Sequence, residues 1–353
     1  MSRLDANLSA KTIDVAKLVI AKPAASKRAG SAPTSTKPLF TDDPLPFDAI
    51  PLMELNVDIA VGRIEVRGLP PLSALRAWLA SVPGRVSVDP ARFGVAGGAL
   101  NGRAALSVAA NSQPRVELMV DAKSISVDVL DAALTGQRHF NGGKANLLAT
   151  LSATGSTAKR IAASGGGNML LSVRDLEIVG SAAAAFDRNV VMTTLGAMMP
   201  KGGADRSLVI QCAVVRLLFQ SGVARIDRSI ALETSEISVV ASGDVNCADQ
   251  TLALSFVPKV KRGLGLNSAS LAGLISVHGP LQEPHVGIDA KGTLRQATVV
   301  GAAVATGGLS LLLPLIRGAA TDTSACEQAA RPGKTTPDKI PSARPGKPPT
   351  PEG

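Results

Sequence analysis

Aromatic side chains are almost missing from this chain of 353 residues. It contains no tyrosine, one tryptophan (Trp78) and seven phenylalanines, so aromatics make up 2% of its residues. Proteins that bind single-stranded nucleic acid stack bases on aromatic rings, and globular cores are commonly anchored by them. The composition therefore argues against single-strand binding and predicts a thin apolar layer of Val, Ile, Leu and Ala.

Catalytic motifs are missing as well. No Gly-x-Ser-x-Gly elbow is present, and the Gly-Lys-Thr triplet at 333–335 lacks the upstream glycine of a phosphate-binding loop because Gln328 occupies that position. The glycine run at 263–268 lacks the third glycine of a dinucleotide fingerprint. The run at 164–168 is expected to be a flexible turn, since no helix is predicted to open after it. We expect no enzyme and no cofactor.

Isolated polar residues give no stronger signal for a reactive centre. The three histidines (His139, His278 and His285) lie near predicted turns, and we expect structural or solvent-exposed roles for them rather than metal binding. The adjacent acids Asp42 and Asp43 suit a turn. Glu233 and Glu236 flank a predicted hairpin turn and are expected to be solvated. Three cysteines are too few for a disulfide scaffold and lack metal-ligand spacing.

The net charge of +9 is concentrated at the two ends of the chain. Residues 1–39 carry a net +5 and residues 331–353 a net +3, which leaves +1 for everything between them. Basic tails meet acidic surfaces or aid solubility, whereas a DNA-reading domain needs its basic residues on the folded surface. No nucleic-acid partner is expected. No cleavable signal peptide opens the sequence, and the 12–22 stretch is too short and too charged to span a bilayer.

From about Leu52 to Ala290 the sequence consists mostly of short runs in which apolar and polar residues alternate. Such runs, separated by Gly, Asn, Asp and Pro, predict about fifteen antiparallel strands with one apolar and one polar face. The run at 230–245 changes phase across Thr234, Ser235 and Glu236, and therefore predicts two strands joined by a tight turn. The run at 115–130 is expected to place Ile125, Val127 and Val129 on one strand face.

Helical signals are fewer. Residues 180–199 carry apolar side chains at helical spacing and stop at Pro200, whereas residues 71–82 are ambiguous between helix and strand. The span 296–316 contains no charge but is diluted by Gly, Thr and Pro. We expect it to cap the sheet or lie at an interface, with a transmembrane helix as the weaker alternative.

These predicted elements divide the chain into four parts. Residues 1–45 are expected to be a linker or edge of a missing upstream region, and residues 46–292 the β-sheet domain. An apolar helical segment at 293–320 and a disordered basic tail at 321–353 follow. A sheet of this size must bury its apolar face. With so few aromatics, a long and strongly bent sheet with an apolar groove is favoured over a sandwich.

The order of the segments resembles the C-terminal region of AsmA-family proteins. The resemblance rests on an acidic-Pro-Leu-Pro opening and a strand within Phe40 to Leu72, and on a Cys-containing strand, Gly turn and hairpin between Leu208 and Val260. The text "ISVHGPLQEPHVGID" near residue 280 is similar to a strand turn of the family. The chain is thus identified as a member, related to TamB-like and bridge-like lipid transfer proteins.

The resemblance implies a periplasmic, inner-membrane-anchored protein of outer-membrane biogenesis whose bent sheet binds phospholipid acyl chains. The N-terminal anchor of the family has no counterpart here, so we expect a fragment or a split gene. The alternative is a scaffold that assists outer-membrane protein assembly without carrying lipid. The resemblance also implies a disulfide between Cys212 and Cys326, worth on the order of 4–5 kcal/mol for so long a loop, against three free thiols. Cys247 would remain unpaired.

The candidate binding site is the apolar face of the predicted strands. Moving an acyl chain of about 16 carbons through water costs on the order of 12 kcal/mol, which an aliphatic groove would remove. An ordinary sandwich core is the alternative role for the same side chains. The residues expected to line the groove are Val57, Ile59, Val61, Leu118, Val120, Ile125, Val127, Ile237, Val239, Leu252, Leu254 and Phe256.

Overall fold

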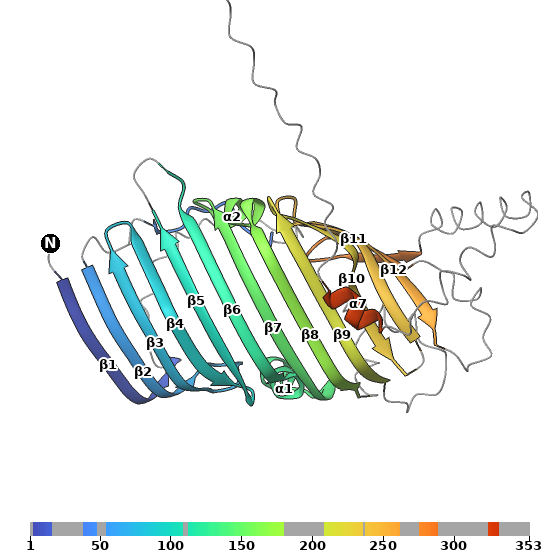
Figure 1. Cartoon of the computed structure of the whole chain (residues 1–353), viewed down its shortest axis with the longest axis horizontal. Helices are drawn as coiled ribbons and strands as arrows, with labels where there is room; N and C mark the ends of the chain where they lie inside the picture. The colour runs from blue at the N-terminus through green and yellow to red at the C-terminus, as the bar shows by residue number, and fades with distance from the viewer. Residues whose placement is uncertain are drawn as a thin grey trace, which may run out of the picture.

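The protein is mainly β, and the described strands form one large bent sheet (Figure 1). The computed structural model describes residues 3–15, 38–47, 54–108, 112–179, 208–235, 237–261, 275–288 and 324–331. Within these ranges lie fourteen strands: β1 (Arg3–Asp14), β2 (Glu54–Glu65), β3 (Leu72–Val82), β4 (Arg85–Val95), β5 (Gly98–Ser107), β6 (Arg115–Ser126), β7 (Phe140–Thr154), β8 (Gly166–Ile178), β9 (Leu208–Gln220), β10 (Val223–Thr234), β11 (Ile237–Asn246), β12 (Thr251–Val260), β13 (Ile275–Pro280) and β14 (His285–Ile288).

The strands follow one another across the sheet in chain order, from β1 at one edge to β14 at the other. Every neighbouring pair is antiparallel except the first, because β1 runs parallel to β2. The fully antiparallel sheet predicted from the sequence is therefore wrong at this pair. A parallel pair needs a connection that returns to the same end of the sheet, and the 39 residues between Asp14 and Glu54 supply it.

The first strand lies where the sequence predicted a linker. Residues 3–14 pair with β2 along their length, so the assignment of residues 1–45 to a linker is wrong for this part. The average composition of the segment hides an alternation in which Leu4, Ala6, Leu8 and Ala10 separate polar residues. That period of two is the signature of a strand with one apolar face.

The pairing registers give the sheet two chemically distinct faces. Residues directly opposite each other in a ladder project to the same side. One continuous path runs from Val57 through Leu79, Val88, Ala104 and Leu118 to Leu151, with an apolar or small residue at each step. The same side continues through Leu171, Val215, Ile230, Ala241, Phe256 and Ile275. We call this side the apolar face and the opposite side, which carries most of the charged residues, the polar face.

Three short helices accompany the described strands. Helix α1 (Val127–Thr135) follows β6, α2 (Ala158–Ser164) precedes β8, and α7 (Ala325–Ala330) lies over β9 and β10 (Figure 1). Helix α7 falls in the predicted disordered tail. The run 164–168 is not a free turn, because it joins the end of α2 to the start of β8. The ambiguous residues 71–82 form strand β3.

The end of β6 is a second departure from the sequence-based expectation. The strand stops at Ser126, and Val127 begins α1, which ends at Gly136 in the left-handed conformation (φ 72°). The apolar residues Val127 and Leu130, together with Leu134, also fit a helical spacing, which a short alternating run cannot exclude. Val127 and Val129 are therefore not strand residues, contrary to the prediction.

Two predicted helical segments, 180–199 and 293–320, lie outside the described residues. Among the residues that are described, no helix is both long enough and apolar enough to cross a membrane.

Candidate functional site

The candidate groove residues are brought together by the strand registers. Val57, Ile59 and Val61 of β2 share the apolar face with Leu118, Val120 and Ile125 of β6. Ile237 and Val239 of β11 and Leu252, Leu254 and Phe256 of β12 lie on the same face farther along. Only Val127 does not belong to it as a strand residue. It packs from α1 against a cluster that contains Leu176, Ile178 and Ile210.

The apolar face carries solvent-exposed side chains in one half of the sheet, although Val57 (6% exposed) and Val61 (4% exposed) of β2 are buried there. On β1, Leu8 is 56% exposed, and on β6, Leu118 is 39% exposed. Between them, most apolar-face residues of β2 to β5 are half-buried, as expected for side chains that stand beside one another on a sheet without a covering layer. We call the apolar face of β1–β8 the open half.

The other half of the apolar face is packed. Ile237 is 6% and Val239 4% exposed, and they contact Phe256 and Ile275 on the neighbouring strands. Ala224, Ile226 and Ala241 on β10 and β11 are buried as well. We call the apolar face of β9–β13 the closed half. Ile237 and Val239 thus belong to a protein core in this structure, which is the alternative role considered for them.

One rim of the sheet is tied together by residues 38–47. The Phe40 N–H donates to Gln250 Oε1 at 2.9 Å, in the turn between β11 and β12. Five residues later, the Leu45 N–H donates to the Ser156 carbonyl oxygen at 3.0 Å, and Thr157 Oγ1 donates to Asp42 Oδ1 at 2.9 Å. This segment therefore links the β11–β12 turn to the start of α2, and Asp42 has a structural role.

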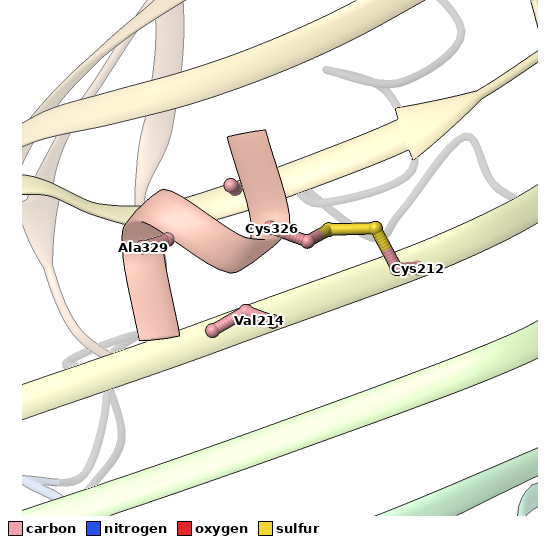
Figure 2. Close-up of a cluster of buried hydrophobic side chains, with 5 residues drawn as sticks. Cys212, Val214, Cys326 and Ala329 are labelled. Atoms are coloured by element: carbon pink, nitrogen blue, oxygen red, sulfur yellow. A yellow bond between two sulfur atoms is a disulfide. The ribbon is translucent and has the colours of Figure 1, made fainter. Parts of the chain in front are cut away.

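A disulfide joins the C-terminal helix to the polar face. Figure 2 shows Cys326 of α7 bonded to Cys212 of β9; Val214 and Ala329 belong to the same buried cluster. The structure thus joins the pair that the resemblance implied. Cys247 is free, and burial raises the pKa of its thiol.

The carboxylate of Glu233 lies buried next to this disulfide, so the expectation that Glu233 is solvated is wrong. It is 7% exposed and accepts hydrogen bonds from Lys261 Nζ (2.8 Å), Ser324 Oγ (2.6 Å) and the Cys326 N–H (3.0 Å). Burial raises the pKa of Glu233, but these bonds outweigh it and lower the pKa to about 2. Glu236 lies outside the described residues.

The histidines do not form a metal site with other ligands in the described ranges. His139 donates its backbone N–H to Asp131 (2.7 Å), and its Nδ1 lies 3.0 Å from the same carboxylate, which fixes α1 to the start of β7. Burial raises the pKa of Asp131, but the bonds to His139 lower it below its usual value. His278 and His285 are exposed cross-strand neighbours on β13 and β14. Among the described residues, the group with metal-ligand proximity is Cys212, Glu233 and Cys326.

Comparison with known proteins identifies the family. The model of the AsmA family matches residues 1–228. The chain belongs to the AsmA family.

A curated AsmA relative gives the same result. The AsmA family protein YhjG of Escherichia coli (strain K12) is 25% identical over 280 residues, which is 74% of this chain. The chain spans only 37% of the length of that relative. No solved structure matches the sequence.

The end of the AsmA match does not coincide with the boundary between the open and the closed half. The matched residues include β1 to β9 and the first part of β10, and thus the whole open half. Glu233, Lys261 and Cys326 lie beyond the matched residues. The AsmA match therefore does not cover the buried carboxylate of Glu233. Its burial was hard to predict from the sequence, because its hydrogen-bond partners Lys261 and Ser324 are 28 and 91 residues away.

Proposed function

We propose that this chain is an envelope protein that binds phospholipid acyl chains on the open half of its apolar face and guides them along it. AsmA-family membership supports the association with the envelope. The observation that carries the lipid proposal is the continuity of the apolar face, which passes from β1 to β8 without a charged side chain on the register path.

Binding would be driven by the removal of water from the acyl chain and from the open half of the apolar face. Each buried methylene is worth about 0.8 kcal/mol, so a chain of about 16 carbons gains on the order of 12 kcal/mol when it leaves water for an apolar surface. The exposed side chains of Leu4, Leu8 and Leu118 gain in the same way when a lipid covers them. Eight strands spaced about 4.8 Å apart give an open half roughly 34 Å long.

The polar face also has exposed apolar side chains, but charged residues interrupt them: Trp78 (47% exposed) lies opposite Asp58, and Leu148 (52% exposed) lies opposite Asp121. On β5 and β6 it carries Arg103, Arg115, Glu117 and Asp121, several of which form ion pairs with one another or with adjacent strands. Covering such pairs with an acyl chain would remove water from charged groups, which costs free energy. This difference in charge supports the apolar face as the lipid-binding side in our proposal.

Two adjacent residues of β6 provide a matched test. Leu118 projects to the apolar face and is 39% exposed, whereas Met119 projects to the polar face and is 36% exposed. We would place a photocrosslinking amino acid at each position in turn and illuminate the protein with phospholipid vesicles. We expect a lipid adduct at position 118 and none at position 119, detected by intact mass spectrometry.

The outcome that would contradict the proposal is equal labelling at both positions or labelling at neither. Labelling at neither, together with no phospholipid in native mass spectra of gently purified protein, would favour the scaffold alternative. In that case, the apolar face would be an assembly surface for protein and not for lipid.

A further inference from the structure

Helix α7 is held on the polar face by contacts that are distant in sequence. It has six residues, far fewer than an isolated helix needs to be stable in water. Its position therefore depends on the sheet, where it lies over β9 and β10 (Figure 1). Releasing these contacts would release the helix as well.

Three kinds of contact dock the helix. The disulfide from Cys212 to Cys326 is covalent, and the methyl groups of Ala325, Ala329 and Ala330 pack with Val214 and Ala231. At the other end of the helix, Arg216 Nε donates to the Ala329 carbonyl oxygen at 2.9 Å. Alanine side chains bury little apolar area, so the hydrophobic part of this docking is small.

Glu233 of β10 adds contacts both to the helix and to Lys261, which follows β12. Its Oε1 accepts from Ser324 Oγ and from the N–H of Cys326, the residue that bears the sulfur. Its Oε2 accepts from Lys261 Nζ at 2.8 Å. The carboxylate thus fixes the backbone of Cys326 directly above Cys212.

The carboxylate is also close to the sulfur atoms themselves. The sulfurs of Cys212 and Cys326 and a Glu233 oxygen all lie within 4.8 Å of one another. A negative charge at this distance disfavours a second negative charge on sulfur. Reduction of a disulfide passes through thiolates, both as the attacking group and as the leaving group. The position of Glu233 therefore favours the oxidised pair in two ways, through geometry and through charge.

We propose that α7 is a redox latch on the polar face and that Glu233 is the positioning residue that keeps it closed. With the disulfide formed, the carboxylate and the S–S bond hold the helix over β9 and β10. When the bond is reduced, the remaining contacts are too few to keep a six-residue helix docked, and α7 leaves the sheet. The latch is independent of the proposed lipid function, because it lies on the opposite face.

The chemical step needs a dithiol as reductant. One thiolate of the dithiol attacks a sulfur of the Cys212–Cys326 bond and forms a mixed disulfide, and the other protein sulfur leaves as a thiolate and takes up a proton. The second thiol of the reagent then displaces the remaining protein sulfur. The reagent ends as a cyclic disulfide, and the two cysteines have gained one hydrogen atom each.

A redox titration tests the role of Glu233. The full chain carrying Cys247→Ser, so that only the pair reacts, is equilibrated in buffers of reduced and oxidised dithiothreitol at pH 7 and trapped with a maleimide. We expect Glu233→Gln to be half-reduced at a ratio of reduced to oxidised reagent on the order of tenfold lower than the parent, as the loss of charge-assisted bonds predicts. Circular dichroism verifies that the sheet is retained.

Two further variants make the result specific. Glu327→Gln changes an exposed carboxylate on α7 itself, which lies 4.0 Å from the guanidinium of Arg331, and we expect this variant to titrate like the parent. Ser324→Ala removes one bond to Glu233 without altering the sheet or the buried charge, and we expect a smaller shift in the same direction. Coincident titrations of Glu233→Gln, Ser324→Ala and Glu327→Gln would overturn the role of Glu233.

Hydrogen exchange tests the latch itself. In the reduced parent we expect faster exchange at residues 324–331 than in the oxidised parent, with β1 to β6 unchanged. Equal protection of residues 324–331 in both states would overturn the latch, because the helix would then be docked without the bond. A stoichiometric zinc complex of the reduced protein would also overturn it and would assign Cys212, Glu233 and Cys326 to a metal centre.

Discussion

Two strands of the apolar face share one sequence pattern, yet apolar residues on them have opposite surroundings. Leu118 in the open half and Val239 in the closed half both alternate with polar residues on antiparallel strands, yet one is 39% and the other 4% exposed. Alternation determines which side of a strand is apolar, and it contains no information on what covers that side. The difference separates a surface available to a ligand from a surface that stabilises the fold.

The largest expected effect is a buried charge in the closed half. Val239→Asp would place a carboxylate among the apolar side chains of Ile237, Phe256 and Ile275. We expect a loss of about 3–5 kcal/mol in the free energy of unfolding, or failure to fold. The matched change Leu118→Asp should cost less than about 1 kcal/mol, because that side chain already meets water. Urea unfolding of both variants measures the difference, and equal losses would remove the distinction between the halves.

The next effect is an acid-induced loss of stability where α7 is docked on the polar face. The pKa of Glu233 is lowered from its ordinary value of 4.5 to about 2, so its contribution is complete above pH 4.5 and is lost as the pH falls from there to about 2. The shift corresponds to about 3 kcal/mol. Unfolding free energies of the parent should fall across this window relative to those of Glu233→Gln. Parallel curves for the two proteins would show that the carboxylate is not stabilising.

A third effect concerns ligand and not stability. Leu8→Asp and Leu118→Asp place charges on the open half, and we expect each to reduce phospholipid retained in native mass spectra several-fold while leaving the unfolding midpoint nearly unchanged. Met119→Asp is the control on the polar face. If Met119→Asp lowers lipid retention as much as Leu118→Asp, phospholipid does not bind preferentially to the apolar face.

The smallest effect is expected on the polar face of the open half. Arg115 Nε and Glu117 Oε1 are 2.9 Å apart, with about half of each side chain exposed. Exposed pairs contribute about 0–1 kcal/mol. Glu117→Gln should therefore change the unfolding free energy by less than about 1 kcal/mol, and less still in high salt. A larger loss would mean that this face is covered in solution.

Much of the fold was predictable because the strands carry a clear period of two. The hairpin of β10 and β11 turns at Thr234 and Ser235, where the phase changes, and the mainly β, bent sheet is confirmed. The parallel pairing of β1 was not predictable, because pairing direction depends on where the connection runs and not on the alternation. Helix α1 was missed because Ser126 to Val129 fits both periods over so short a span.

The surroundings of individual site residues were less predictable. Glu233 stands beside a turn, a position that usually faces water, and its burial depends on Lys261 and Ser324, which the chain brings back from far away. Ile237 and Leu118 looked equivalent because each has apolar neighbours two residues away. Their difference arises from packing between elements, for which a single sequence gives no local signal.

The central claim is that the open half forms one continuous surface for acyl chains. Photocrosslinking to phospholipid at Leu8, Ile59 and Leu118, which share the apolar face of β1, β2 and β6, tests it most directly, with Asn7, Asp58 and Met119 as neighbours on the polar face. The account predicts lipid adducts at all three apolar positions and at none of the polar ones. Adducts at a single strand, or equal adducts on both faces, would contradict it.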